Sequence, residues 1–285
     1  MTALPMTAPP LRVSALYVHP VKSCAGVRVD DLMLDALGAV DDRRFMLVDA
    51  AGNFVSQRRH PQLALVSVAR AADSGVVLTV QGRAPLDVAV PETSLAPRLV
   101  TIWDDTVSVR DCGDSAAAWL SAVLGLGVRL VHMGNDSVRP VDPRFAPHDA
   151  RTALSDGFPL LVATDASLAD LIARAGTPLE MERFRPNVVL SGAAPWEEDT
   201  WDALQIGDIT LRLVKPCARC AITLVDPRTG NVGVEPLRTL ARFRRGADLG
   251  YAGAEAGKTY FAWNALHDSP GRLRVGDEVR AVRRS

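Results

Sequence analysis

The chain has 285 residues, of which 48% are hydrophobic and 23% charged, so it can form one large or two ordinary cores without disulfide or metal support. Its 32 Lys and Arg residues against 33 Asp and Glu residues leave a net charge of −1, which argues against nucleic acid or an acidic membrane surface as a partner. The longest apolar runs, such as residues 158–163, are far shorter than the roughly 20 residues that span a bilayer.

The N-terminal residues and the cysteine content both bear on the cellular compartment. Residues 1–10 contain prolines but neither a basic start nor a continuous apolar stretch, so they predict a flexible leader rather than a signal peptide. Four cysteines, two of them in a Cys-x-x-Cys, are typical of reduced thiols rather than of a secreted disulfide framework. We therefore expect a cytoplasmic protein.

The first half of the chain reads as β structure. Short runs rich in Val, Leu and Thr predict strands at residues 15–20, 29–35, 43–49, 64–70, 75–82 and 86–90. Gly52 and Asn53 tolerate positive φ, so the segments beside them are expected to form an antiparallel hairpin. Apolar residues at three- and four-residue spacing predict a helix over 114–124, capped by Asp114 or Ser115. We assign residues 11–130 to a β-barrel-like N-terminal domain.

The second half begins after a long loop or domain junction at residues 133–149, which has prolines and polar residues but no period. Residues 156–176 then predict a buried strand and a helix capped by Thr164 or Asp165. Further strands are predicted at residues 187–192, 208–216, 220–227, 258–266 and 277–282, with a hairpin turn at 226–230. We assign residues 131–285 to a second β-barrel domain, which makes the fold class mainly β with peripheral helices (α+β).

The segment Pro216-Cys217-Ala218-Arg219-Cys220 is the sharpest chemical feature. A thioredoxin-like redox pair requires a helix directly after the motif, whereas the following residues predict a strand. Zinc requires further ligands at compact spacing, which neither the other cysteines nor the five histidines supply. Two interpretations stay open: a single thiolate beside Arg219, offered to a soft metal that brings its other ligands, or two buried cysteines that act as small hydrophobes.

Cationic side chains suggest an anion site in the first half. Lys22 and Ser23 follow a predicted strand in a turn and are able to present an ammonium, a hydroxyl and backbone N–H groups to a phosphate. Arg43-Arg44 and Arg58-Arg59 lie on the two arms of the predicted hairpin, where alternation brings one arginine of each pair to a common face. The alternative is an exposed turn and a solvated charged rim.

Arg185 and Asn187 form a further candidate in the second half. They come just before a buried strand, which places a guanidinium and an amide where they are able to read a polar heterocycle. The alternative is a surface loop ahead of a core strand.

In their order along the chain, these motifs resemble one family. HPVKSC, DRRF and the SQRR segment resemble the β-barrel domain found ahead of MOSC domains. RFRPNVVLSG, EEDTWDALQIGD, KPCARC and VDPRTG resemble the MOSC domain of the molybdenum-cofactor enzymes of the amidoxime-reducing component family. The resemblance extends from Leu11 to Val282 and implies two β-rich domains with a molybdenum cofactor (Mo-molybdopterin) in the cleft between them.

The resemblance also implies residue roles. It makes Cys220 the catalytic residue and the protein ligand of molybdenum, and it excludes Cys217 from that role. The cofactor-binding residues that we expect are Lys22, Ser23, Arg44, Arg58, Arg185, Asn187 and, beside the thiolate, Arg219. Ala218 stands where relatives commonly have serine, so any hydrogen bond from that hydroxyl is absent.

The implied reaction is the reduction of N-hydroxylated compounds, such as hydroxylaminopurines, amidoximes and hydroxylamines, to amines. Because the chain lacks the cysteine set of an iron–sulfur domain, electrons are expected from a separate donor protein, either ferredoxin-like or cytochrome b5-like with its reductase. The alternative is a protein that binds or carries the cofactor, or carries sulfur, without reductase turnover. A metal-free binding module is a third class, and it requires the cysteines to be structural.

Overall fold

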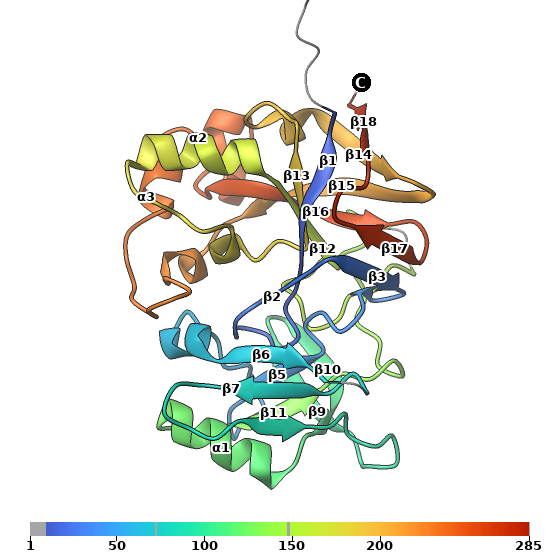
Figure 1. The fold of residues 1–285 in the computed structure, drawn as a ribbon, viewed down its shortest axis with the longest axis vertical. Coiled ribbons are helices and arrows are strands. Elements are labelled where there is room, and N and C mark those ends of the chain that lie inside the picture. Colours follow the sequence, from blue (N-terminus) through green and yellow to red (C-terminus); the bar gives the residue numbers. More distant parts are fainter. Residues whose placement is uncertain (1–9, 72, 147–148, 285) are drawn as a thin grey trace, which may run out of the picture.

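The computed structural model describes residues 10–71, 73–146 and 149–284, so the predicted leader, apart from Pro10, lies outside the described residues. Figure 1 shows two bodies stacked along the long axis of the molecule. The upper body contains helices α2 (Asp165–Ala175) and α3 (Leu237–Leu240), and the lower body contains α1 (Asp114–Leu124). Among the described residues, no helix is long and apolar enough to cross a membrane.

The upper body is built on the largest sheet of the described chain. Its strand order is β18 (Arg280–Arg283), β14 (Trp201–Ile206), β15 (Ile209–Ala218), β16 (Tyr260–His267), β12 (Leu160–Thr164), β13 (Val188–Ser191), β1 (Arg12–Val18) and β2 (Val27–Val29). Neighbours are antiparallel except β12 and β13, which α2 connects as a parallel pair. All five residues of β12 are buried, as expected for a strand covered on both faces.

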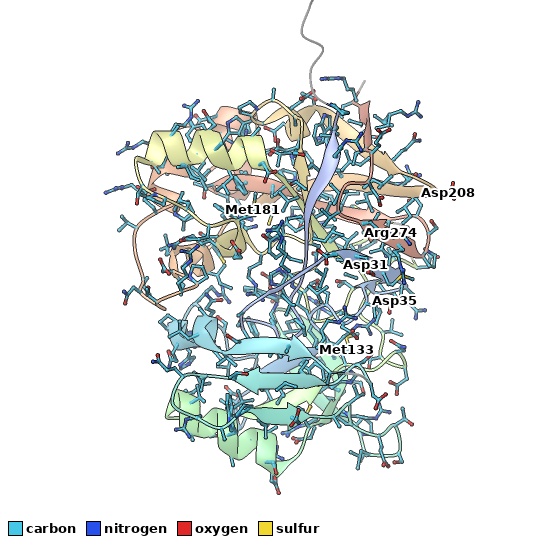
Figure 2. All side chains as sticks on the ribbon, viewed as in Figure 1. Asp31, Asp35, Met133, Met181, Asp208 and Arg274 are labelled. Atoms are coloured by element: carbon cyan, nitrogen blue, oxygen red, sulfur yellow. The ribbon has the colours of Figure 1, made fainter. Side chains whose placement is uncertain are left out.

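The N-terminal segment completes this upper body rather than the lower one. Strand β1 pairs with β13, and β3 (Asp31–Asp35) pairs with β17 (Gly271–Arg274) in a small sheet that also holds β4 (Gly38–Ala39). The register places Asp31 opposite Arg274, and both are labelled in Figure 2. Leu16 and Leu32 share one buried core cluster with Trp201 from the C-terminal half. The predicted division near residue 130 therefore does not coincide with the boundary between the two bodies, because strands from both sides of it pair in the same sheets.

The lower body packs two small sheets and a helix around a second core. One sheet has the order β5 (Phe45–Val48), β11 (Arg129–His132), β10 (Asp105–Asp111) and β9 (Arg98–Ile102). The other has the order β6 (Ser67–Arg70), β7 (Val76–Thr79) and β8 (Leu86–Val88). Helix α1 packs on β11 and β8 and buries Leu120 against this core. The mainly β fold with peripheral helices is thus confirmed.

Both predicted helices are confirmed, and their caps differ. Thr164 caps α2 as predicted, because its hydroxyl accepts a hydrogen bond from the backbone N–H of Ser167. The prediction of Asp114 or Ser115 as the α1 cap is wrong. Gly113 occupies that position with φ +92°, a backbone conformation that favours glycine, and Asp114 lies in the first turn.

Two hairpin predictions have different outcomes. The turn at 226–230 is confirmed, since Val225 and Val232 form an antiparallel bridge around it. Around Gly52, Val48 bridges antiparallel to Phe54, but the chain then leaves the pairing and residues 57–59 form a turn. The predicted second arm is therefore too short to carry Arg58-Arg59 on a strand.

The predicted strand after the Cys-x-x-Cys is wrong. Residues Ala221–Leu224 form a short 3₁₀ helix, η4, with Cys220 at its N-cap position. An apolar run of this length does not by itself distinguish a strand from a buried helical turn. The other 3₁₀ helices of the described chain are η1 (Pro61–Leu65), η2 (Met181–Phe184), η3 (Glu197–Thr200), η5 (Ala247–Leu249) and η6 (Gly253–Glu255). The described residues between β11 and β12 contain neither helix nor strand, as the predicted loop at 133–149 requires.

Candidate functional site

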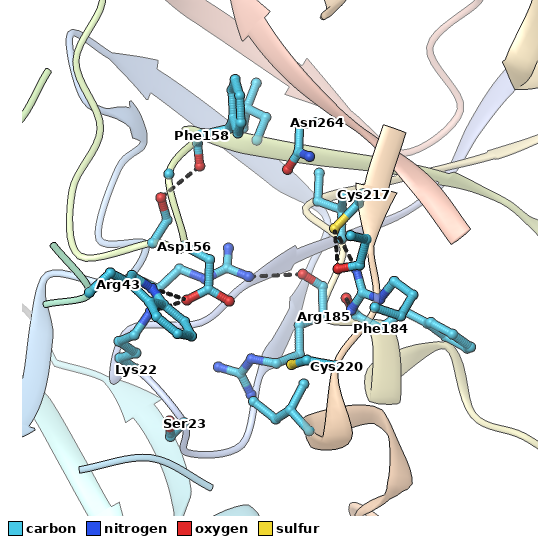
Figure 3. Close-up of a pocket in the computed structure, with 18 of the residues that line it drawn as sticks. Lys22, Ser23, Arg43, Asp156, Phe158, Phe184, Arg185, Cys217, Cys220 and Asn264 are labelled. Atoms are coloured by element: carbon cyan, nitrogen blue, oxygen red, sulfur yellow. Dashed lines mark hydrogen bonds and ion pairs between the residues drawn. The ribbon is translucent and has the colours of Figure 1, made fainter. Parts of the chain in front are cut away.

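A cleft of about 230 Å³ lies where the two bodies meet. It is lined by side chains from the turn after β1, the loop before β12, the segment between η2 and β13, and the end of β15 (Figure 3). Of the predicted site residues, the cleft brings together Lys22, Ser23, Arg58, Arg185, Asn187, Arg219 and Cys220. Arg44 is not among its lining residues.

Lys22 occupies the turn after β1, where its backbone N–H donates to the carbonyl of Phe45. Its side chain is 8% exposed, and its ammonium forms an ion pair with Asp156. Burial lowers the pKa of Lys22, and the Asp156 carboxylate opposes that shift. Ser23, the next residue, has φ +73°, an uncommon conformation for a serine that is found at constrained functional sites. The turn thus holds a buried ammonium that already binds a carboxylate.

Asp156 belongs to the loop before β12 and is 64% exposed at its side chain. One carboxylate oxygen also accepts a hydrogen bond from Trp103 Nε1 at 3.3 Å. Partial loss of water around the carboxylate acts to raise the pKa of Asp156, but the Lys22 ammonium and then Arg43 hold it below its ordinary value. Asp156 is therefore an anion at neutral pH, and a second anion that approaches Lys22 has to compete with it.

Arg43, rather than Arg44, contributes to the cleft. Its Nη2 donates to the carbonyl of Arg185 at 2.9 Å, and its Nη1 donates to Asn187 Oδ1 at 3.1 Å. The resemblance selected Arg44, whose guanidinium instead donates to Asp35 at 2.6 Å and to Asn135 at 2.9 Å. Asp35 lies on β3, between the two bodies (Figure 2).

The backbone conformation explains why Arg43, and not Arg44, lines the cleft. Arg43 has φ +47° in the turn before β5, so simple strand alternation does not govern which arginine of the pair faces the cleft.

Arg185 ends η2 with φ +56°, and its Nη1 donates to the carbonyl of Cys24 at 2.6 Å. Its Nη2 is buried and has no hydrogen-bond partner within the described part of the chain. Burial, and then the neighbouring Arg43 guanidinium, lower the pKa of Arg185 to about 10. A buried guanidinium with a free N–H is a site where an anionic or carbonyl-bearing ligand gains a hydrogen bond.

Asn187 is fully buried and serves the protein itself. Its Oδ1 accepts from the backbone N–H of Leu161 at 3.1 Å, and its Nδ2 donates to the carbonyl of Tyr17 at 3.2 Å. With the bond from Arg43, the amide ties β1 and β12 to the turn before β5. It is thus placed to position Arg43 rather than to expose an amide to a ligand.

The two cysteines of the motif have different surroundings. Cys217 lies within β15, and its Sγ accepts a hydrogen bond from Arg219 Nη1 at 2.8 Å. Burial raises the pKa of Cys217, and the Arg219 guanidinium opposes that rise. Arg219 Nη2 donates to the carbonyl of Phe184 at 2.9 Å, while its buried Nε lacks a partner among the described residues. Cys220 lines the same cleft at the start of η4 (Figure 3).

Because a helical turn follows Cys220, the secondary structure after the motif does not exclude a thioredoxin-like redox pair. What remains different is that Cys217 lies inside a strand, and η4 has only four residues, which supply little aligned dipole to the thiol.

The donor set determines which group the cleft fits. Among the described residues, no cluster of three or more His, Cys, Asp or Glu side chains is able to hold a metal ion on its own. The cleft instead offers the thiols of Cys217 and Cys220, several cations, and two buried N–H donors, Arg185 Nη2 and Arg219 Nε, which have no partner among the described residues. This set fits an anionic cofactor that brings most of the ligands of its own metal.

Several lining residues carried no signal in the sequence. Asp156 lies in an ordinary Ser-Asp-Gly turn, Phe54 follows Gly52-Asn53, and Trp103 lies in the link between β9 and β10. Lys215 belongs to the KPCARC segment, but nothing in that segment predicted a role for its side chain.

Comparison with known proteins gives consistent matches along the chain. Residues 10–126 match the MOSC N-terminal beta barrel domain, and residues 149–280 match the MOSC domain. Mitochondrial amidoxime-reducing component 1 of Homo sapiens is 35% identical over 281 residues, which cover 94% of this chain and 82% of the human protein. Mitochondrial amidoxime reducing component 2 of Bos taurus is 34% identical over 279 residues, with the same two shares. The solved structure of the YUAD protein from Bacillus subtilis aligns with 95% of this chain over 94% of its own length, at 12% identity and a TM-score of 0.39.

Proposed function

The chain belongs to the family in which a MOSC N-terminal β-barrel domain precedes a MOSC domain, and from this premise we propose that it is a molybdenum-cofactor-dependent reductase of N-hydroxylated compounds. The observation that carries the proposal is the cleft between the two bodies, in which Cys220, at the start of η4, lines the same hollow as several cationic side chains. The amidoxime-reducing components among its relatives support the reaction type.

The residues of the cleft divide the task of holding the cofactor. Lys22, Ser23 and Arg43 would bind its phosphate, with the Lys22 ammonium exchanging Asp156 for the phosphate oxygens. Arg185 Nη2 and Arg219 Nε would donate to its polar ring atoms, since both are buried donors without a protein acceptor in the described chain. Cys220 would provide the bond from the protein to the metal. When bound, the cofactor supplies two-electron redox chemistry at an oxygen atom.

The net reaction balances without any group beyond a reductant and protons. The N–O bond of a hydroxylamine breaks, an N–H bond forms, and the oxygen leaves as water, which consumes two electrons and two protons. We propose that a separate donor protein supplies the electrons, because the four cysteines are dispersed as Cys24, Cys112 and the pair in the motif. Protons reach the cleft from solvent at its mouth, where the Asp156 side chain is 64% exposed.

The free state of all four cysteines fits a reducing compartment, and we propose a cytoplasmic location. Under this proposal the small-molecule substrate and the electron donor are the only partners that the reaction requires.

The test is elemental and pterin analysis of protein made in a host that synthesises the cofactor, followed by reduction of benzamidoxime with chemically reduced protein. The proposal predicts about one molybdenum per chain, as the single candidate ligand Cys220 requires, together with formation of benzamidine. Molybdenum without turnover would instead indicate a cofactor carrier. Protein that contains neither molybdenum nor pterin would contradict both.

A further inference from the structure

A second cavity, of about 410 Å³, adjoins the cleft on the side of the lower body. The two hollows share four lining residues: Phe54, Ser56, Arg58 and Trp103. A ligand that enters the cleft from this side therefore passes two aromatic rings and a guanidinium. The cofactor-binding roles proposed above give no function to Phe54, Arg58 or Trp103.

Trp103 has an unusual position for a large aromatic residue. It lies in the two-residue link between β9 and β10, where Ile102 pairs with Asp105, and it has φ +56°. Such links favour glycine or asparagine, because a bulky side chain at positive φ is strained. The side chain is nonetheless 40% exposed, so burial in a core does not compensate for that strain. Strained residues of this kind cluster at ligand sites.

The neighbours of Trp103 form a stacking arrangement. The Arg58 guanidinium lies 4.4 Å from the centre of the indole and 5.8 Å from the centre of the Phe54 ring. The two rings are 5.1 Å apart at an interplanar angle of 54°. A guanidinium is planar and stacks on aromatic faces, so a planar ligand on this face of the indole shares it with Arg58 or displaces the guanidinium.

The indole is also oriented from the opposite wall. Its Nε1 donates to Asp156 at 3.3 Å, and Asp156 lines the cleft that contains Cys220. The ring is thus held by its edge, while Arg58 lies over one of its faces. This contact connects the aromatic group directly to the candidate active site.

We propose that Trp103, with Phe54 and Arg58, binds the planar ring of the substrate at the mouth of the cleft. The inference rests on the proposed reductase function and defines its preferred substrates as N-hydroxylated groups attached to an aromatic or heteroaromatic ring. Because the two hollows share Trp103, a ring bound there lies next to the cleft that Cys220 lines. Arg58 then contacts the substrate rather than the cofactor.

The test compares 6-hydroxylaminopurine, which is planar, with N-methylhydroxylamine, which lacks a ring, on cofactor-loaded protein. In Trp103→Gly the ratio of kcat/KM for the planar to the aliphatic substrate is expected to fall about tenfold or more, as for loss of one stacking contact. The fall is expected mainly in KM. Glycine suits the backbone at this position, so the variant is expected to fold.

Two further variants separate stacking from a structural role. Trp103→Phe keeps an aromatic face but loses the N–H that contacts Asp156, and it is expected to preserve the substrate ratio. Leu99→Ala removes a 70% exposed side chain from β9 and is expected to leave both substrates unaffected. An unchanged ratio in Trp103→Gly, or an equal loss in Trp103→Phe, would overturn the inference.

Binding of adenine, a planar compound without an N-hydroxyl group, gives a readout that does not depend on turnover. Calorimetry is expected to show adenine binding to the wild type and to Trp103→Phe, and much weaker binding to Trp103→Gly. If the protein binds adenine in this pattern but reduces neither substrate, the reductase proposal fails and the stacking site stands. If it reduces both substrates while adenine binding does not depend on Trp103, the stacking site fails and the reductase stands.

Discussion

Arg219 donates a hydrogen bond through Nη1 to the sulfur of Cys217 at 2.8 Å, and Cys217 is the cysteine that the proposed chemistry does not use. Arg219 thus shapes the cleft by fixing the end of β15, and its Nη2 bond to the carbonyl of Phe184 ties that end to η2. The two thiols of the motif are chemically distinct, which makes their roles separable by experiment.

The first prediction concerns the reactivity of Cys217. Burial raises the pKa of this thiol and Arg219 opposes the rise, so Arg219→Gln is expected to raise the pKa further and to slow alkylation by iodoacetamide at pH 8. Mass spectrometry of the labelled peptides measures the rate. Cys112, whose raised pKa comes from burial and from Asp111, is the internal control and is expected to keep its rate. Faster alkylation of Cys217 in the variant would contradict the role given to Arg219.

The second prediction compares the adjacent arginines. Arg43→Gln is expected to lower the molybdenum content of purified protein, because Arg43 lines the cleft and braces Arg185. Arg44→Gln, the matched control, is expected to retain its molybdenum and to lower the unfolding free energy by about 1 to 3 kcal/mol, since the Asp35 carboxylate loses its charged partner. Metal analysis and urea unfolding measure the two effects. A greater loss of metal in Arg44→Gln would reverse the assignment.

The third prediction concerns competition at Lys22. Asp156→Asn removes the carboxylate that now pairs with the ammonium, so inorganic phosphate is expected to bind cofactor-free protein roughly tenfold more tightly, in keeping with the strength of a charged hydrogen bond. Calorimetry measures the affinity. Asp142→Asn, which removes a carboxylate paired with Arg144, is the control. Phosphate binding that weakens in Asp156→Asn would show that the carboxylate assists anion binding instead of competing with it.

The fourth prediction concerns stability in acid. Burial, followed by the nearby Arg44 and Arg110, lowers the pKa of His132 to about 4. The unfolded chain therefore takes up a proton at this residue below its ordinary pKa of about 6.5, while the folded protein does not, so stability falls as the pH drops from 6.5 towards 4. At pH 5 the loss from this residue is about 2 kcal/mol relative to pH 7.5. Urea unfolding of His132→Gln is expected to show a flatter pH dependence than the wild type, and an identical slope would contradict the assignment.

Local patterns predicted much of this fold. The alternating apolar runs placed β1, β7 and β16, and the period of residues 114–124 placed α1. Long-range pairing carries no such signal, which is why the placement of β1 beside β13 in the C-terminal sheet did not follow from the chain order.

The candidate site shows the same limit. Lys22, Ser23 and the Cys-x-x-Cys belong to short motifs that can be read in the sequence. Asp156 and Trp103 contribute only because two loops meet across the bodies. The choice of Arg43 over Arg44 depends on a positive φ in the preceding turn, which residue type does not specify there.

The most direct test of the central claim is the turnover of Cys220→Ser and Cys217→Ser, each divided by its measured molybdenum content, together with the number of sulfur neighbours of molybdenum from X-ray absorption. Cys220→Ser is expected to lose nearly all turnover per molybdenum and one sulfur neighbour, because Cys220 is the proposed ligand. Cys217→Ser is expected to keep most of its turnover and the wild-type sulfur count. Equal losses in the two variants, or loss of the sulfur neighbour in Cys217→Ser alone, would contradict the assignment of Cys220.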